Sequence, residues 1–102
     1  MKATWAALAA VGIMAAAPAG AQEKLAQASG CMTCHGIDKK IVGPAFKEVA
    51  AKYRNDKNAA AKLVAKVKNG GKGVWGDIPM PPNAHVKDED IKKLVDWILS
   101  LK

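Results

Sequence analysis

The chain has 102 residues, half of them hydrophobic, and its formal net charge is +7 at neutral pH. A chain this short forms one domain at most and buries only a small core, so domains of this size usually contain a disulfide, a metal or another staple. A disulfide between the two cysteines would close a short loop and would stabilise the fold little. The sequence therefore predicts a different staple.

The N-terminal segment has the three parts of a secretory signal peptide. Lys2 precedes an Ala-rich apolar run at 5–17, and Ala19-Gly20-Ala21 is a small-residue cleavage site. The apolar run is shorter than the ~20 residues that a membrane anchor needs. We therefore predict a cleaved signal peptide at 1–21, a mature domain at 22–102, no stable membrane insertion, and a periplasmic location.

The mature chain has the apolar spacing of helices and lacks the alternation typical of strands. Apolar residues recur at i, i+3, i+4 and i+7, and Asn-Gly-Gly after Lys68 is a strong helix stop. Three acidic residues from Asp88 favour the first turn of a last helix. We predict an all-α fold with helices at 23–28, 44–53, 58–68 and from 88 to the chain end, and with loops at 36–43 and 70–82.

Cys31-Met32-Thr33-Cys34-His35 follows the first predicted helix and spells C-x-x-C-H, the attachment motif of a c-type haem. Two thiols at this spacing reach two neighbouring vinyl groups of one porphyrin and form thioethers. The adjacent His35 is then held under the iron as an axial ligand. A large apolar haem would also supply the core that a short chain lacks.

Two haem-free interpretations compete with this one. A C-x-x-C pair can be a thiol–disulfide motif, but that interpretation expects a βαβ pattern, which the sequence lacks. Cys31, Cys34, His35 and His85 can also be counted as zinc ligands, but their spacing fits a zinc finger poorly.

A second axial ligand is expected from the long loop at 70–82. Met80 lies there between Pro79 and Pro81, which stiffen the loop and reduce the cost of holding the sulfur at the iron. His/Met ligation raises the reduction potential of a haem. His85 is the alternative ligand, but a lone His beside a charged helix start is more often solvated.

At this point the chain resembles a known family, the short monohaem class I cytochromes c of bacteria, of the 551/552 type. The resemblance covers 22–102, and the IPMPPN loop with the preceding VWG is its most specific part. It implies a small class I cytochrome c fold of about four helices around one covalently attached haem c. The matching stretches are GCMTCHGID from Gly30, VGPA from Val42, KNGGKGVWG from Lys68, IPMPPN from Ile78 and WILS from Trp97.

The resemblance implies a role for each residue of the haem attachment and of the axial ligation. Cys31 and Cys34 would carry the thioethers, and His35 and Met80 would be the axial ligands. The carbonyl of Pro44 would accept the second imidazole N–H of His35, although a proline there is also typical of a helix start.

Further roles follow from the same resemblance. Asn83 would hydrogen-bond near the Met80 sulfur, and the Trp75 indole N–H would reach a haem propionate. Gly30 would let the first and last helices cross closely beside Trp97. Lys66 stands where relatives often place an arginine for a propionate, and we leave it out of the site because a lysine offers no bidentate fork.

These residues predict a diffusible one-electron carrier and not an enzyme, because an iron with two axial ligands has no position open for a substrate. The alternative is a peroxidase-like enzyme or gas sensor in which Met80 leaves the iron. Cleavage would remove Lys2 and leave a charge of +6. That charge suits acidic docking surfaces of redox proteins more than nucleic acid, which a secreted chain rarely meets. The resemblance implies a nitrite reductase or terminal oxidase as acceptor, a cytochrome bc complex as donor, and a monomer.

Overall fold

The computed structural model describes residues 19–102, which form four α-helices and no strand. Most of the predicted signal peptide, residues 1–18, lies outside the described residues. A short 3₁₀ helix that the sequence analysis did not predict precedes α2. The elements in chain order are α1 (Ala19–Ala28), η1 (Cys31–Thr33), α2 (Phe46–Lys52), α3 (Ala59–Asn69) and α4 (Asp88–Ser100). The prediction of an all-α fold with about four helices is confirmed.

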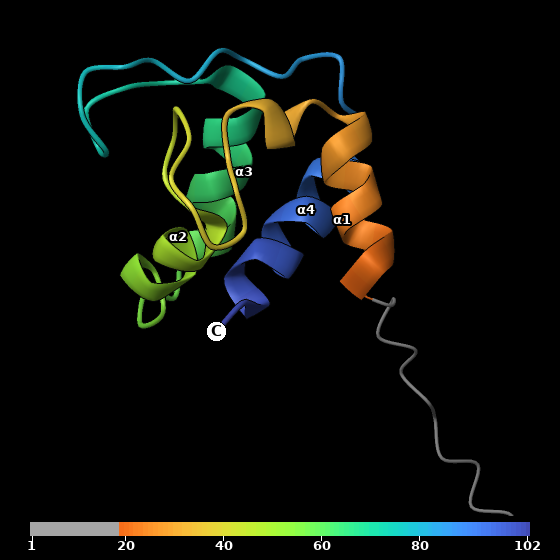
Figure 1. Cartoon of the computed structure of the whole chain (residues 1–102), viewed down its shortest axis with the longest axis horizontal. Coiled ribbons are helices and arrows are strands. Elements are labelled where there is room, and N and C mark those ends of the chain that lie inside the picture. The colour runs from red at the N-terminus through yellow and green to blue at the C-terminus, as the bar shows by residue number, and fades with distance from the viewer. Residues whose placement is uncertain (1–18) are drawn as a thin grey trace, which may run out of the picture.

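The last helix, α4, is the element against which the other three α-helices pack. Its apolar stripe is the reason, because Ile91, Leu94 and Val95 are each no more than 1% exposed. Figure 1 shows α4 between α1 on one side and α2 and α3 on the other. Among the helices of residues 19–102, none combines the length and apolar character that crossing a bilayer requires.

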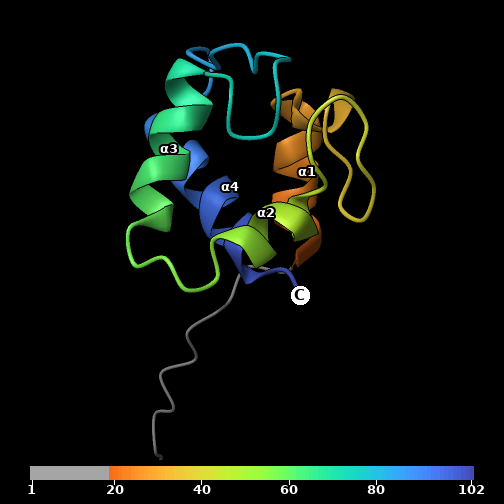
Figure 2. The same ribbon diagram turned by 90° about the vertical axis from the view of Figure 1, so that its left-hand side faces the viewer.

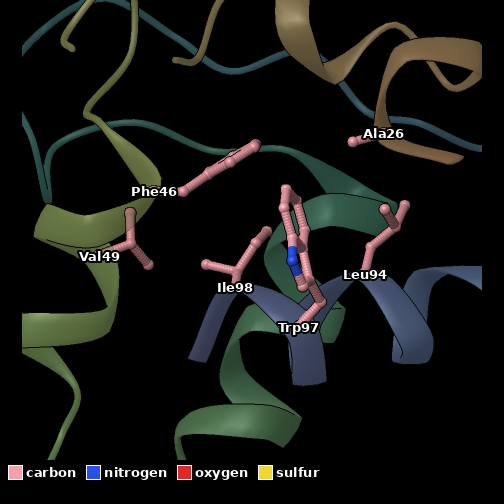
Figure 3. Packing of buried hydrophobic residues seen from close by; sticks show 6 residues of the cluster. All are labelled: Ala26, Phe46, Val49, Leu94, Trp97 and Ile98. Carbon is pink, nitrogen blue, oxygen red and sulfur yellow. The ribbon is translucent and has the colours of Figure 1, made fainter. Parts of the chain in front are cut away.

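The main core cluster joins α1, α2 and α4. The Phe46 and Trp97 rings meet edge to face with their centroids 5.7 Å apart, a favourable geometry for an aromatic pair. Ala26 on α1 is fully buried, which lets that helix approach closely. The cluster consists of Ala26, Phe46, Val49, Leu94, Trp97 and Ile98 (Figure 3).

Two helix starts differ from the prediction by two residues or more. Helix α1 begins at Ala19 and not at 23, so the predicted cleavage site falls within its first turn. Helix α2 begins at Phe46 and not at Pro44, because Ala45 is extended, with φ −59° and ψ 143°. Pro44 is therefore not the first residue of a helix, and its carbonyl is available for another contact.

A glycine is needed at position 30 for a different structural reason from the one that the resemblance implied. Its φ is +85°, a left-handed conformation that glycine adopts at no steric cost, and it ends α1 just before Cys31. A Cβ built on Gly30 would meet no atom within 4 Å. The backbone conformation, and not a close crossing of α1 and α4, accounts for a glycine at this position.

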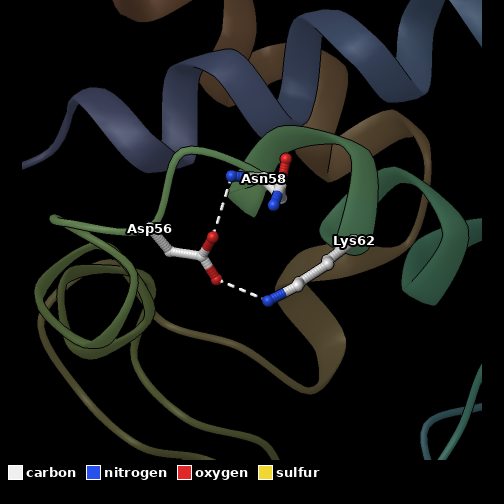
Figure 4. Close-up of polar contacts among 3 residues, drawn as sticks. All are labelled: Asp56, Asn58 and Lys62. Carbon is white, nitrogen blue, oxygen red and sulfur yellow. Dashed lines mark hydrogen bonds and ion pairs between the residues drawn. The ribbon is translucent and has the colours of Figure 1, made fainter.

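The turn before α3 is fixed by a carboxylate. Asp56 Oδ1 accepts the Asn58 backbone N–H at 2.8 Å, and Asp56 Oδ2 lies 2.7 Å from Lys62 Nζ (Figure 4). The bond from Lys62, followed by the bond from Asn58, lowers the pKa of the Asp56 carboxyl. In this turn Asp56 provides the side-chain oxygen, and Asn58 provides a backbone donor.

Candidate functional site

A cleft of about 380 Å³ lies between two walls that come from distant parts of the sequence. One wall contains Cys31, Cys34 and His35, and the other contains the end of α3 and the loop that carries Met80. Figure 2 shows the two parts on either side, with the 36–43 loop beside α1 and the 70–82 loop beside α3. The lining is mainly apolar, as expected of a site for a large apolar group.

The two thiols are brought into the cleft by η1 and the turn after it. The backbone N–H groups of Cys34 and His35 both donate to the Cys31 carbonyl, at 3.2 and 3.0 Å. This tight turn presents both thiols and the imidazole to one cleft. Burial raises the pKa of the Cys31 thiol.

The His35 imidazole is held on three sides. Its Nδ1 lies 2.7 Å from the Pro44 carbonyl oxygen, so Nδ1 carries the proton and donates it, which leaves Nε2 as the ligating nitrogen. The ring stacks on Phe46 with the centroids 5.0 Å apart and an interplanar angle of 20°. On another side, a Cβ built on Gly43 would lie 2.6 Å from His35 Cε1. The ring therefore has little freedom to turn.

Gly43 was not a predicted site residue, although it lies within the VGPA stretch. Its role depends on the approach of the His35 ring to the backbone, which sequence spacing does not reveal. A glycine directly before Pro44 was the available signal.

Met80 is held by a pair of backbone hydrogen bonds. The Gly71 N–H donates to the Met80 carbonyl at 3.0 Å, and the Met80 N–H donates to the Gly71 carbonyl at 2.8 Å. Gly70 has a φ of +72°, and a Cβ there would overlap the Met80 carbonyl oxygen. The Asn-Gly-Gly segment therefore does more than stop α3, because it is also the surface against which the Met80 backbone lies.

Asn83 fixes the segment that follows Met80. Its Nδ2 donates to the carbonyls of Val67 at 3.1 Å and Pro81 at 3.2 Å, and its backbone N–H also donates to Val67, at 3.0 Å. These bonds attach the segment to α3. The predicted bond between Asn83 and the Met80 sulfur stays a prediction.

Trp75 lines the cleft with 42% of its surface exposed. Lys52, at the end of α2, places its Nζ 5.5 Å from the Trp75 ring centroid, within the range of a cation–π contact. This contact joins α2 to the 70–82 loop. The predicted bond from Trp75 to a propionate stays a prediction.

Two residues that we weighed outside the site are now placed. Lys66 lines the cleft, and its Nζ lies against the Gly71 backbone, so the side chain left out of the site does reach it. The signal available in the sequence was the resemblance, which implies a basic residue for a propionate at this position. His85 is not among the lining residues, and its Nε2 lies 3.3 Å from the Ser29 carbonyl oxygen. Met80 is thus the better placed of the two candidate ligands.

The residues present fit a covalently attached haem. Two thiols and an imidazole with an oriented Nε2 come from one wall, and a thioether comes from the other. Three lysines, Lys40, Lys66 and Lys72, also line the cleft and suit the carboxylates of a porphyrin.

Comparisons with known proteins point to one family. The sequence model of the cytochrome c family matches residues 20–102. The chain is 64% identical to cytochrome c-551 of Allochromatium vinosum over 77 residues, which is 76% of this chain and 82% of that protein. It is 48% identical to cytochrome c-552 of Nitrosomonas europaea over the full length of both.

Solved structures show the same likeness. The fold matches the crystal structure of wild-type cytochrome c552 of Nitrosomonas europaea with a TM-score of 0.76 and 52% identity. That match covers 78% of this chain and 99% of that one. It also matches the class 1 cytochrome MtoD of Sideroxydans lithotrophicus, with a TM-score of 0.68, 40% identity, and coverage of 82% and 96%.

The fold and the site define a small haem-binding electron-transfer protein. The chain belongs to the cytochrome c family, and it has the class I cytochrome c fold. The family attaches haem c covalently through a cysteine pair, which here is Cys31 and Cys34. The resemblance, the fold, the cofactor and the expectation of an electron carrier and not an enzyme are confirmed.

Proposed function

We propose that this cytochrome c is a diffusible, monomeric one-electron carrier of the periplasm, with His35 and Met80 as the axial ligands of its haem iron. The observation that carries the proposal is that both side chains line one cleft while their backbones are fixed by separate hydrogen bonds. When bound, the haem supplies reversible one-electron chemistry, and the protein supplies ligands, burial and orientation.

The two proposed ligands determine the direction in which the protein shifts the reduction potential of the haem. The Pro44 carbonyl holds the His35 proton on Nδ1, which orients the ring and raises the basicity of Nε2. Met80 would hold the iron through its thioether, a ligand that favours the reduced iron and raises the reduction potential of a haem. With His35 and Met80 both bound, the iron would have no site for a substrate, as an electron carrier requires.

The charge of the chain supports docking to acidic redox proteins. Lys40 and Lys72 are exposed at the cleft, and a formal charge of +7, or +6 after removal of Lys2, would steer association with an acidic partner. The proposed acceptors are a nitrite reductase or a terminal oxidase, and the proposed donor is a cytochrome bc complex. The segment at 1–21 has the sequence pattern of a signal peptide and supports the periplasmic location.

Redox titration of two methionine variants tests the ligand assignment. Met80→Ala should keep the attached haem, lose the near-infrared methionine–iron band of the ferric protein and lower the reduction potential, since axial identity contributes to a range of about 0.8 V across haem proteins. Met32→Ala is the matched control, because Met32 lies inside the C-x-x-C-H motif and packs against the core. An unchanged potential in Met80→Ala would mean that Met80 is not the ligand.

A further inference from the structure

Helix α4 packs against both α1 and α3, but the segment that carries Met80 needs its own link to the wall with the C-x-x-C-H motif if the distance between His35 and Met80 is to stay constant. The segment 80–86, which we call the Met80 segment, is attached to the α3 wall by hydrogen bonds to Gly71 and Val67. These bonds fix the segment relative to α3. They do not fix it relative to α1 and the C-x-x-C-H motif, which form the other wall.

His85 makes that connection. Its Nε2 lies 3.3 Å from the carbonyl oxygen of Ser29, a residue 56 positions earlier in the chain. Within residues 19–102, this is the one hydrogen bond between the Met80 segment and the part of the chain from 19 to 43. A carbonyl oxygen only accepts, so Nε2 carries the proton and donates it.

The Ser29 carbonyl is a fitting anchor because Ser29 is buried and directly follows the last residue of α1. Ser29 is 8% exposed, and the last carbonyls of a helix lack partners within the helix. Gly30 follows Ser29 and directly precedes Cys31. The bond to Ser29 therefore holds the Met80 segment close to the cysteines that would carry the thioethers. Val86, beside His85, packs against the core cluster and keeps the imidazole close to α1.

We propose that His85 is a positioning residue that clasps the Met80 segment to the end of α1 and so slows the departure of the Met80 sulfur from the iron. The inference rests on the proposed His35/Met80 ligation. His85 does not line the cleft, and it acts through the backbone that carries Met80. Loss of the clasp removes the one hydrogen bond, within residues 19–102, that joins the Met80 segment to the wall with the C-x-x-C-H motif.

The test is the rate at which cyanide displaces Met80 from the ferric protein, followed by the loss of the near-infrared band. His85→Leu should react about five-fold faster than the wild type, which is the factor that corresponds to about 1 kcal/mol for one hydrogen bond. His85→Gln should stay within about two-fold of the wild type, because its amide nitrogen is placed like Nε2 and donates in the same way. Lys87→Leu, an exposed apolar control two residues away, should also match the wild type.

The proposed role of the bond between His85 and Ser29 is wrong if His85→Leu reacts at the wild-type rate, or if His85→Gln reacts as fast as His85→Leu. A wild-type protein without the near-infrared band would instead overturn the proposed ligation. In that case the clasp is read from hydrogen exchange of the Met80 amide, which donates to Gly71. Faster exchange in His85→Leu than in His85→Gln supports the clasp, and equal exchange overturns it.

Discussion

Gly43→Ala tests whether the backbone beside the His35 ring determines the orientation of that ring. The new Cβ would lie 2.6 Å from His35 Cε1, which is 0.8 Å shorter than the 3.4 Å of an ordinary van der Waals contact. The φ of Gly43 is not positive, so the backbone itself accepts alanine. The cost therefore comes from the clash with the ring.

The His35 ring cannot move away from the new Cβ without weakening one of its other contacts. Its Nδ1 is held 2.7 Å from the Pro44 oxygen, and its face lies on Phe46. Relief of the clash lengthens the hydrogen bond or disturbs the stack, and overpacking of this kind costs about 1–3 kcal/mol. We expect the free energy of unfolding to fall by about 2 kcal/mol, in the middle of that range.

Guanidinium unfolding measures the loss of stability, and the NMR signal of the His35 Nδ1 proton reports on the bond to Pro44. Gly73→Ala is the matched control, because Gly73 has a φ of +99° and open space around it. Its backbone strain costs on the order of 1–3 kcal/mol without touching His35. A change in stability of less than about 0.5 kcal/mol in Gly43→Ala, the usual range of a surface substitution, or an unchanged Nδ1 proton signal would contradict the clash with the His35 ring.

Three further predictions concern the core, the turn before α3 and the partner. Trp97→Ala removes a ring that is 8% exposed and should lower the free energy of unfolding by about 3–5 kcal/mol, measured by guanidinium unfolding; a loss below about 1 kcal/mol would contradict its placement in the core. Asp56 has a lowered pKa in the folded protein, so its stabilising effect is present above its usual pKa of about 3.9 and is lost as the pH falls through the lower folded value. Asp56→Asn should therefore remove part of the acid destabilisation seen in unfolding curves below about pH 4, and an unchanged pH dependence would refute the bond to Lys62. Association with an acidic partner should slow as salt is raised from low to physiological concentration, measured by stopped flow, whereas a salt-independent rate would argue against electrostatic steering.

Sequence patterns were sufficient where the chemistry is local. The spacing of Cys31, Cys34 and His35 specifies a haem attachment site within five residues, and the prolines beside Met80 mark a stiff loop. The apolar stripe of the last helix follows from its 3.6-residue period, and the structure buries it as predicted.

Patterns were insufficient where a contact joins distant segments. Pro44 is equally consistent with a helix start and with an acceptor for His35, and the two are separated only by the extended Ala45 and the 2.7 Å bond. The roles of Gly43 and His85 depend on which backbone each one approaches. No periodicity or motif predicts these contacts, because they form only when segments that are distant in the sequence come together in the fold.

In the proposed ligation, His35 closes one side of the iron and Met80 closes the other. Spectroscopy of the purified protein tests it most directly, through the near-infrared band of the ferric form and the binding of carbon monoxide to the ferrous form. We expect a weak methionine–iron band and poor binding of carbon monoxide. Rapid carbon monoxide binding at neutral pH, with no such band, would contradict it.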